Sequence, residues 1–231
     1  MLTALQRLLF APTLLESQLY PPLKRPVRFR TYLQGDRGSC IQIYQKNAAG
    51  RFPESQISEF EAYLDNESKT LIVAECDSKV VGYGGIIITS AETATLCYGI
   101  IDPAFQRQRI GATLTLLRIA QLPPHPKRIF VMILAVNASL PIYKRFGFVE
   151  GGKWKAKDGT EHPIGLLRVP ARSLQTIKLT LQRRGIRVDG NISLHPSEEM
   201  TCQVEEGDRG AYRIRFRNCA DGKTPAATNS E

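Results

Sequence analysis

The sequence has few of the residues that build disulfide frameworks or metal centres. Its five cysteines are odd in number and widely spaced, and no Cys-x-x-Cys pair occurs. Its three histidines, His125, His162 and His195, are scattered along the chain. This pattern argues against a disulfide scaffold and against a zinc site, so we expect no metal. Reduced thiols and a cytoplasmic location fit it best.

Long apolar runs are also missing. No stretch approaches the length of about 18 apolar residues that a transmembrane helix needs, so we expect no membrane span. The start of the chain, residues 1–15, has leucines at helical spacing. It lacks the basic start and the small-residue cleavage site of a secretory signal. We therefore expect an amphipathic arm that packs on this chain or on a partner.

Acidic residues are outnumbered by basic ones. The formal net charge is +9 and the isoelectric point is near 9.5. An excess of positive charge favours anionic partners, which include a phosphorylated cofactor, nucleic acid or an acidic surface. Charge alone does not choose among them. The content of 42% hydrophobic and 23% charged residues is typical of a globular protein.

Short strands and helices are expected to alternate in the middle of the chain. Apolar alternation and β-branched content predict strands at 27–32, 71–75, 80–89, 94–101, 128–136, 148–154 and 164–169. Apolar residues at helical spacing predict helices after Asp36 and at 57–64, 110–122 and 139–146. Short polar turns make 71–101 an antiparallel meander. The strand–helix–strand unit that follows predicts that strands 94–101 and 128–136 are parallel or splayed.

Composition divides the chain into three parts. Residues 1–26 form an N-terminal arm and a stiff, proline-rich basic linker. Residues 27–170 carry the alternating strands and helices and form the predicted domain. Residues 171–231 have looser periodicity and form a C-terminal appendage, in which 173–182 is helix or strand and 212–217 alternates apolar residues with arginine. The end, 220–231, is expected to be disordered.

The segment from Gln106 to Leu114 connects an expected strand to an expected helix. The first N–H groups of a helix lack intrahelical partners, and the helix dipole adds partial positive charge there. Such a junction can bind phosphate. Arg107 and Arg109 add positive potential, and Gly111 lets the backbone approach a ligand closely. An ordinary basic turn is the alternative, because short phosphate-loop patterns have many false positives.

These residues and those downstream resemble the GNAT superfamily, the GCN5-related N-acetyltransferases. Gln106 and Gly111 occupy the first and last positions of its Gln/Arg-x-x-Gly-x-Gly/Ala signature. Arg109 stands where the first glycine of the signature is usual. It could crowd a pyrophosphate, or the turn could keep its shape with the side chain pointing outward. Downstream, Asn137 and residues 140–148 resemble the family's Asn … Tyr-x-x-x-Gly-Phe segment, which places Tyr143 at its tyrosine.

The resemblance, which covers residues 27–169, implies a fold and a co-substrate. The fold is a mixed α/β sheet that splays after the third meander strand, with helices on both faces and terminal extensions. The co-substrate is acetyl-CoA. Its pyrophosphate would lie on the loop backbone and its amide-rich arm along the strand edge near Ile101. The implied cofactor-binding residues are Ile101, Gln106, Arg107, Gln108, Arg109, Ile110, Gly111, Ala112 and Asn137.

In such enzymes an amine attacks the thioester directly. Tyr143 matches the general acid that protonates the departing thiolate, although a phenol is ordinarily a weaker acid than a thiol. A packing role is the alternative for Tyr143. Glu92 is a candidate base and Glu75 another, and each could equally be a solvated surface carboxylate. A free backbone N–H could polarise the thioester carbonyl.

The sequence therefore predicts an acetyl-CoA-dependent N-acetyltransferase. The amine acceptor is open among small amines, amino-acid derivatives, aminoglycoside-like compounds, protein amines and aminoacyl-tRNA. The alternative is a non-catalytic GNAT-like module that senses CoA or contacts nucleic acid or protein, and Arg109 is the feature that favours it. The apolar face of strand 212–217 must be covered by this chain or by a second copy, so a homodimer is a further alternative.

Overall fold

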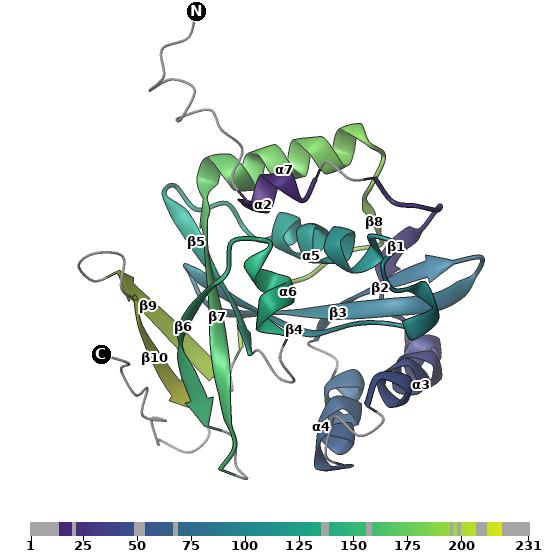
Figure 1. The fold of residues 1–231 in the computed structure, drawn as a ribbon, viewed down its shortest axis with the longest axis horizontal. Helices are drawn as coiled ribbons and strands as arrows, with labels where there is room; N and C mark the ends of the chain where they lie inside the picture. The colour runs from purple at the N-terminus through teal and green to yellow at the C-terminus, as the bar shows by residue number, and fades with distance from the viewer. Residues whose placement is uncertain are drawn as a thin grey trace, which may run out of the picture.

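The chain forms a mixed α/β fold with helices on both faces of one large sheet (Figure 1). The structure is a computed structural model. It describes residues 14–19, 22–48, 54–66, 69–134, 139–155, 159–194, 196–197, 200–206 and 212–218. Within these ranges the predicted class, a mixed sheet flanked by helices, is confirmed.

The large sheet has eight strands in the order β6-β7-β5-β4-β3-β2-β1-β8. These strands are β1 (Arg28–Thr31), β2 (Thr70–Cys76), β3 (Lys79–Ser90), β4 (Thr93–Ile101), β5 (Arg128–Leu134), β6 (Val149–Lys155), β7 (Glu161–Pro170) and β8 (Val188–Asp189). A second sheet pairs β9 (Met200–Glu206) with β10 (Tyr212–Asn218). The predicted antiparallel meander is confirmed as β2, β3 and β4.

Apart from α2, which precedes β1, the helices lie between these strands along the chain. They are α2 (Leu14–Ser17), α3 (Arg37–Ala48), α4 (Glu54–Asp65), α5 (Ile110–Gln121), α6 (Leu140–Lys144) and α7 (Ala171–Arg183), with short 3-10 helices η1 (Gln34–Asp36) and η2 (Pro103–Phe105). The stretch 173–182, which the sequence left open between helix and strand, is helical.

The sheet opens between β4 and β5. These strands are parallel, but they pair only where Thr93–Thr95 meets Phe130–Met132. Beyond Thr95, β4 continues for six more residues with no described partner on that side. The predicted parallel, splayed arrangement is confirmed. Among the described residues, the edge of β4 beyond Thr95 therefore has no strand partner on this side.

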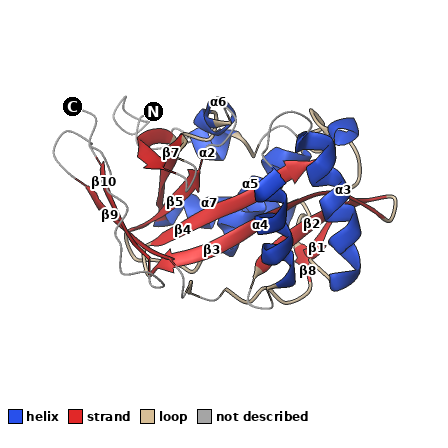
Figure 2. Cartoon of the chain, turned by 90° about the horizontal axis from the view of Figure 1, so that it is seen from below, coloured by secondary structure: helices blue, strands red, loops and turns tan. Residues whose placement is uncertain are grey.

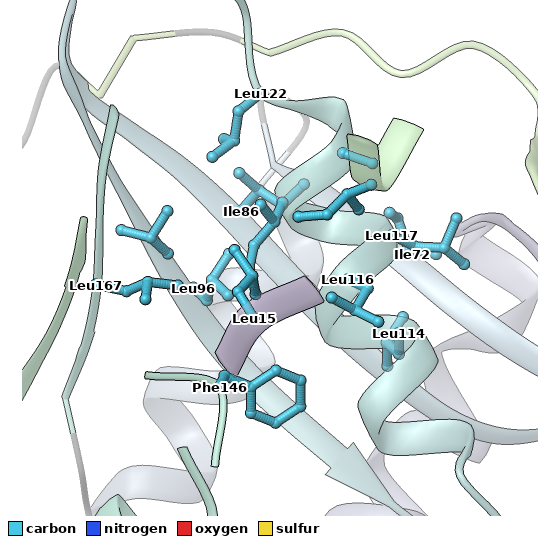
Figure 3. Packing of buried hydrophobic residues seen from close by; sticks show 14 of the residues in the cluster. Leu15, Ile72, Ile86, Leu96, Leu114, Leu116, Leu117, Leu122, Phe146 and Leu167 are labelled. Atoms are coloured by element: carbon cyan, nitrogen blue, oxygen red, sulfur yellow. The ribbon is translucent and has the colours of Figure 1, made fainter. Parts of the chain in front are cut away.

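Helices α5 and α7 cover one face of the sheet. The largest hydrophobic core lies beneath them, and α5 contributes several fully buried residues, including Leu114, Leu116 and Leu117. Figure 3 shows that Leu15, from α2, points into this cluster near Leu116 and Phe146. The short N-terminal helix is therefore part of the core.

The opposite face is covered in two separate parts. Helices α3 and α4 cover β2, β3 and the end of β4 through a core that includes Phe60 and Tyr83. The hairpin of β9 and β10 covers β5 and β7, where Ile214 and Phe216 pack against Phe130 and its neighbours. In Figure 2 the two parts lie at opposite ends of β3 and β4.

The C-terminal part of the described chain shares these cores. Leu174, Ile177 and Leu181 of α7 are buried in the same cluster as α5. Strand β8 pairs with β1 at the edge of the large sheet. A domain boundary at Pro170 stays a prediction, and these contacts argue against a loosely attached appendage. The apolar face of β10 is covered by this same chain, so it does not require a second copy.

Some expectations fall outside the described residues. These are most of the N-terminal arm (1–13), the tail 220–231 and Asn137. Among the described helices, none is long and apolar enough to cross a membrane.

Candidate active site

A bulge in β4 creates the centre of the candidate site. The pairing of β4 with β3 shifts register between Tyr83 and Gly85, so Tyr98 and Gly99 both lie opposite Gly84. Tyr98 has a positive φ of 47°. A bulge leaves its extra residue unpaired and re-aims side chains. The site is therefore built where β4 has already separated from β5.

The bulge also changes which way the side chains point. The thiol of Cys97 lies 3.6 Å from the Tyr63 hydroxyl, and the Tyr98 ring packs on the same Tyr63 at 4.8 Å between centroids. Two consecutive residues thus face α4. Gly99 faces the other way, toward α5 and α6, where an added Cβ would meet atoms of Arg118 and Tyr143.

Tyr143 reaches the bulge from α6. Its hydroxyl oxygen lies 3.2 Å from the point where a Cβ of Gly99 would lie. The Tyr143 ring packs edge-on against Phe148 at 5.3 Å, which orients the side chain toward β4. The structure therefore brings the predicted acid to the open edge of the sheet.

The loop before α5 has the geometry of a tight strand-to-helix turn. Arg107 and Arg109 have positive φ values of 59° and 71°. Arg109 is the N-cap of α5, and its carbonyl accepts the Thr113 N–H at 3.0 Å. The N–H groups of Ile110, Gly111 and Ala112 then open the helix without intrahelical acceptors.

Arg109 occupies the left-handed conformation that glycine adopts most easily. Its guanidinium donates to the Gln18 carbonyl at 2.7 Å and to the Gln18 amide oxygen at 3.4 Å. Its Nε is buried with no hydrogen-bond partner, and burial lowers the Arg109 pKa. The turn keeps its shape, and the side chain is directed toward the N-terminal segment (residues 14–19).

The N-terminal segment connects the two helices that flank the open edge. The Gln18 amide nitrogen donates to the carbonyl of Arg145, the C-cap of α6, at 3.1 Å. The Leu19 carbonyl accepts a hydrogen bond from Arg184 after α7. Through Gln18, the start of α5 is tied to the end of α6.

Other predicted loop residues support the turn itself. Gln106 donates to the Ile101 carbonyl and to Asn47 Oδ1, each at 3.1 Å. Gln108 donates to the Ala104 carbonyl at 3.3 Å. A Cβ on Gly111 would lie 3.3 Å from Ile101 Cγ1, so this glycine permits close packing of α5 on β4.

Glu92 is not brought to the site. It lies in the turn before β4, whereas Tyr143 meets the strand at Gly99, a separation of roughly 20 Å for six to seven residues of extended chain. The Glu92 side chain is 46% exposed and lies 3.3 Å from His125 Nε2. Glu75 lies on β2 and forms a salt bridge with Arg30 at 2.9 Å. Neither carboxylate reaches the bulge.

Sequence reasoning missed Arg118, which the structure places under the bulge. Its guanidinium donates to the carbonyls of Gly85 and Cys97, at 3.3 and 3.2 Å. The local sequence gave one signal for Arg118, because it is an arginine in the middle of the largely apolar run 110–122. Nothing in the sequence showed that β3 and β4 would supply its acceptors.

The splayed sheet, the β4 bulge and the turn into α5 define an acetyltransferase fold of the GNAT type. The sequence model for the acetyltransferase (GNAT) domain matches residues 40–163, more than half of the chain. The chain therefore belongs to the GNAT family.

The chain is similar to several solved structures. An assigned GNAT-family acetyltransferase from Desulfovibrio desulfuricans is 19% identical, with a TM-score of 0.50 over 62% of this chain and 98% of that chain. The ribosomal-protein-S18-alanine N-acetyltransferase from Escherichia coli is 21% identical, with a TM-score of 0.48 over 63% and 94%. The yncA protein from Salmonella typhimurium, solved with acetyl-CoA, is 15% identical, with a TM-score of 0.46 over 64% and 95%. Comparison with curated proteins finds no match.

Proposed function

We propose that this protein transfers an acetyl group from acetyl-CoA to a primary amine by direct attack. The observation that carries the proposal is the meeting of Tyr143 with the β4 bulge at Gly99, beside the unpaired edge of β4. This arrangement places a hydroxyl donor beside backbone groups of β4 that have no strand partner among the described residues. Those are the groups that acyl transfer needs around its reacting carbonyl.

The residues present fit an acetyl-CoA molecule. The first N–H groups of α5 are free to hold a pyrophosphate, with Arg107 exposed beside them. The open edge of β4 can pair with an amide-rich arm as an added strand would. When bound, acetyl-CoA supplies the activated acetyl thioester. The unpaired backbone of the bulge is then placed to polarise its carbonyl, and Tyr143 to donate to its sulfur.

A covalent route through Cys97 is disfavoured, although this thiol lies at the bulge. Burial raises the Cys97 pKa to about 11, against the opposing effects of the Tyr63 hydroxyl and of Arg118. The nucleophile in such chemistry is the thiolate, which is scarce at neutral pH for such a group. Direct attack by the amine avoids this step.

The acceptor is proposed to approach from the face of α4 and the β9–β10 hairpin. Tyr63 and Tyr98 lie on this face, opposite Tyr143. Neither Glu92 nor Glu75 reaches the bulge, so we propose that the ammonium proton leaves through water.

The proposal is tested by two measurements on the full chain. Mass spectrometry of the purified protein should detect CoA or acetyl-CoA, and thiol release should follow addition of acetyl-CoA with members of an amine panel. The panel should contain small amines, amino-acid derivatives, aminoglycosides, peptides and aminoacyl-tRNA. CoA bound without thiol release for any amine would identify a non-catalytic CoA-binding module.

A further inference from the structure

Arg118 is the largest side chain that the described part of the chain buries completely. It is 1% exposed, in the middle of α5. A guanidinium stays charged in proteins because it is a very weak acid. Moving such a charge out of water is expensive unless an opposite charge or several hydrogen bonds compensate it. The position of Arg118 therefore requires a physical reason.

Its described partners are all neutral. Besides the carbonyls of Gly85 and Cys97, it donates to the Thr115 hydroxyl at 3.2 Å. Its Nε is buried with no hydrogen-bond partner. Within the described residues, no carboxylate lies at salt-bridge distance from it. The hydrogen bonds fix its position, but no carboxylate among the described residues compensates its positive charge.

The charge lies at the candidate site. Arg118 Nη2 is 2.9 Å and the Tyr143 hydroxyl 3.2 Å from the same point, where a Cβ of Gly99 would lie. A Cβ on Gly84 would lie 2.8 Å from Arg118 Cζ. Two glycines on neighbouring strands thus make room for the guanidinium under the bulge. The positive charge of Arg118 acts on neighbouring groups at the site. Burial raises the pKa of Cys97 and of Tyr63, and Arg118 partly offsets this by lowering both.

We propose that the buried positive charge of Arg118 acts electrostatically across the bulge to stabilise the thiolate of CoA as it leaves, an inference that rests on the proposed function. The amine nitrogen forms a bond to the acetyl carbon, and the carbon–sulfur bond breaks. The electron pair of that bond stays on sulfur, beside the guanidinium. The ammonium proton leaves through water, and the thiolate sulfur takes a proton from Tyr143 or from solvent.

This role supplements Tyr143 for a chemical reason. A phenol has an ordinary pKa of about 10 and a thiol about 8.5, so proton transfer from phenol to thiolate is unfavourable. A fixed buried cation stabilises the negative sulfur before any proton arrives, and it needs no reorganisation at that moment. Low dielectric at the site strengthens the interaction.

The test is the ionisation of the CoA thiol on the protein. Ultraviolet absorbance of the thiolate is measured against pH for bound CoA, with desulfo-CoA as the reference that subtracts the protein's own groups. Wild type, Arg118→Met, Arg118→Lys and Thr115→Val are compared. Thr115→Val removes one acceptor and keeps the charge, so it is the matched control.

We expect the thiol of CoA bound to wild type to have a pKa at least one unit below that of free CoA. In Arg118→Met this lowering should be lost. Arg118→Lys and Thr115→Val should retain most of the shift, and desulfo-CoA affinity should stay equal in all four proteins. The proposal is overturned if CoA bound to wild type has a thiol pKa equal to or above that of free CoA. This outcome needs no variant to fold. An Arg118→Met protein with an unchanged shift overturns the proposal as well. Failure of wild type to bind CoA at all would instead refute the proposed function.

Discussion

Arg109 shows how one residue can keep the shape of a loop and still change its connections. Its φ of 71° costs a non-glycine residue roughly 1–2 kcal/mol. Its charged hydrogen bonds to Gln18 are worth about 1.5–3 kcal/mol. The two contributions are similar in size, so the arginine is tolerated where glycine is usual in the family. What Arg109 adds to the structure is the attachment of the N-terminal segment to the loop.

Arg109→Gly should therefore detach that segment. We expect faster hydrogen exchange in residues 14–19, a loss of unfolding free energy of about 1 kcal/mol, and CoA affinity within about twofold of wild type. Arg107→Gly is the control, because it removes the same charge from the other left-handed position of the loop. Weaker CoA binding with a shallower salt dependence, in Arg109→Gly only, would mean that Arg109 contacts phosphate.

Asp36 gives a prediction for pH. Arg30 donates two hydrogen bonds to this buried carboxylate, at 2.7 and 2.9 Å. Burial alone would raise the Asp36 pKa, but the bonds from Arg30 and from the Leu33 N–H outweigh it and lower the pKa. The pair therefore stabilises the fold above the ordinary carboxyl pKa of about 3.9, and this stabilisation is lost as pH falls through the lower native value.

Asp36→Asn should cost about 2–3 kcal/mol at pH 7, toward the low end for a broken buried pair, because Arg30 keeps its bond to Glu75. Urea unfolding at pH 7 and pH 3 measures this, and the difference from wild type should shrink at pH 3. Asp65→Asn, which breaks the exposed pair with Arg37, should change little. A cost that does not depend on pH would show that Asp36 acts through packing alone.

At the scale of elements, β4 determines the site. The position of this strand was predictable from the sequence, but its bulge was not. Local apolar pattern predicted β4 and α5 nearly to the residue, and chain order predicted the splay. The bulge was not predictable, because Leu96, Cys97 and Tyr98 are all apolar and carry no change of alternation. Arg118 and Gly99 meet only through tertiary packing. For the same reason the position of Glu92 relative to Tyr143 was not predictable, since sequence proximity to β4 did not say at which end of the strand Tyr143 would lie.

Gly99→Ala tests the bulge. The new Cβ would lie within 3.2 Å of both Arg118 Nη2 and the Tyr143 hydroxyl, so one of them must move. We expect kcat for acetyl transfer to fall about tenfold or more with the fold retained, because small displacements of catalytic groups have large effects on rate. Gly38→Ala on α3 meets no atom within 4 Å and should keep full activity. Full activity in Gly99→Ala would place the chemistry elsewhere.

At the scale of the whole molecule, α2, α7 and the β9–β10 hairpin belong to the hydrophobic cores. The sequence described the region after Pro170 as loose because 173–182 fits helix or strand and β8 has only two residues. Strand β9 carried a signal that was overlooked, since Met200, Cys202 and Val204 alternate with polar residues. The partners of these segments lie far away in sequence, so their burial could not be inferred locally.

A chain of residues 21–170 should therefore fail to fold. It would lose Leu174, Ile177 and Leu181, whose burial is worth roughly 1.5–3 kcal/mol each. That loss is comparable with the whole stability of a typical domain, about 5–15 kcal/mol. A chain of residues 14–218 is the control and should unfold cooperatively in urea. A soluble chain of residues 21–170 that binds CoA would instead support the predicted domain boundary at Pro170.

The central claim, direct acetyl transfer at the β4 bulge, is tested most directly by a single-turnover reaction. Wild type and Tyr143→Phe are loaded with isotopically labelled acetyl-CoA and mixed with an amine that releases thiol in the panel. In wild type, label should pass to the amine without appearing on the protein. In Tyr143→Phe, the rate should fall about 100-fold or more while acetyl-CoA affinity changes little. Label accumulating on the protein, or a Tyr143→Phe rate equal to wild type, would contradict the account.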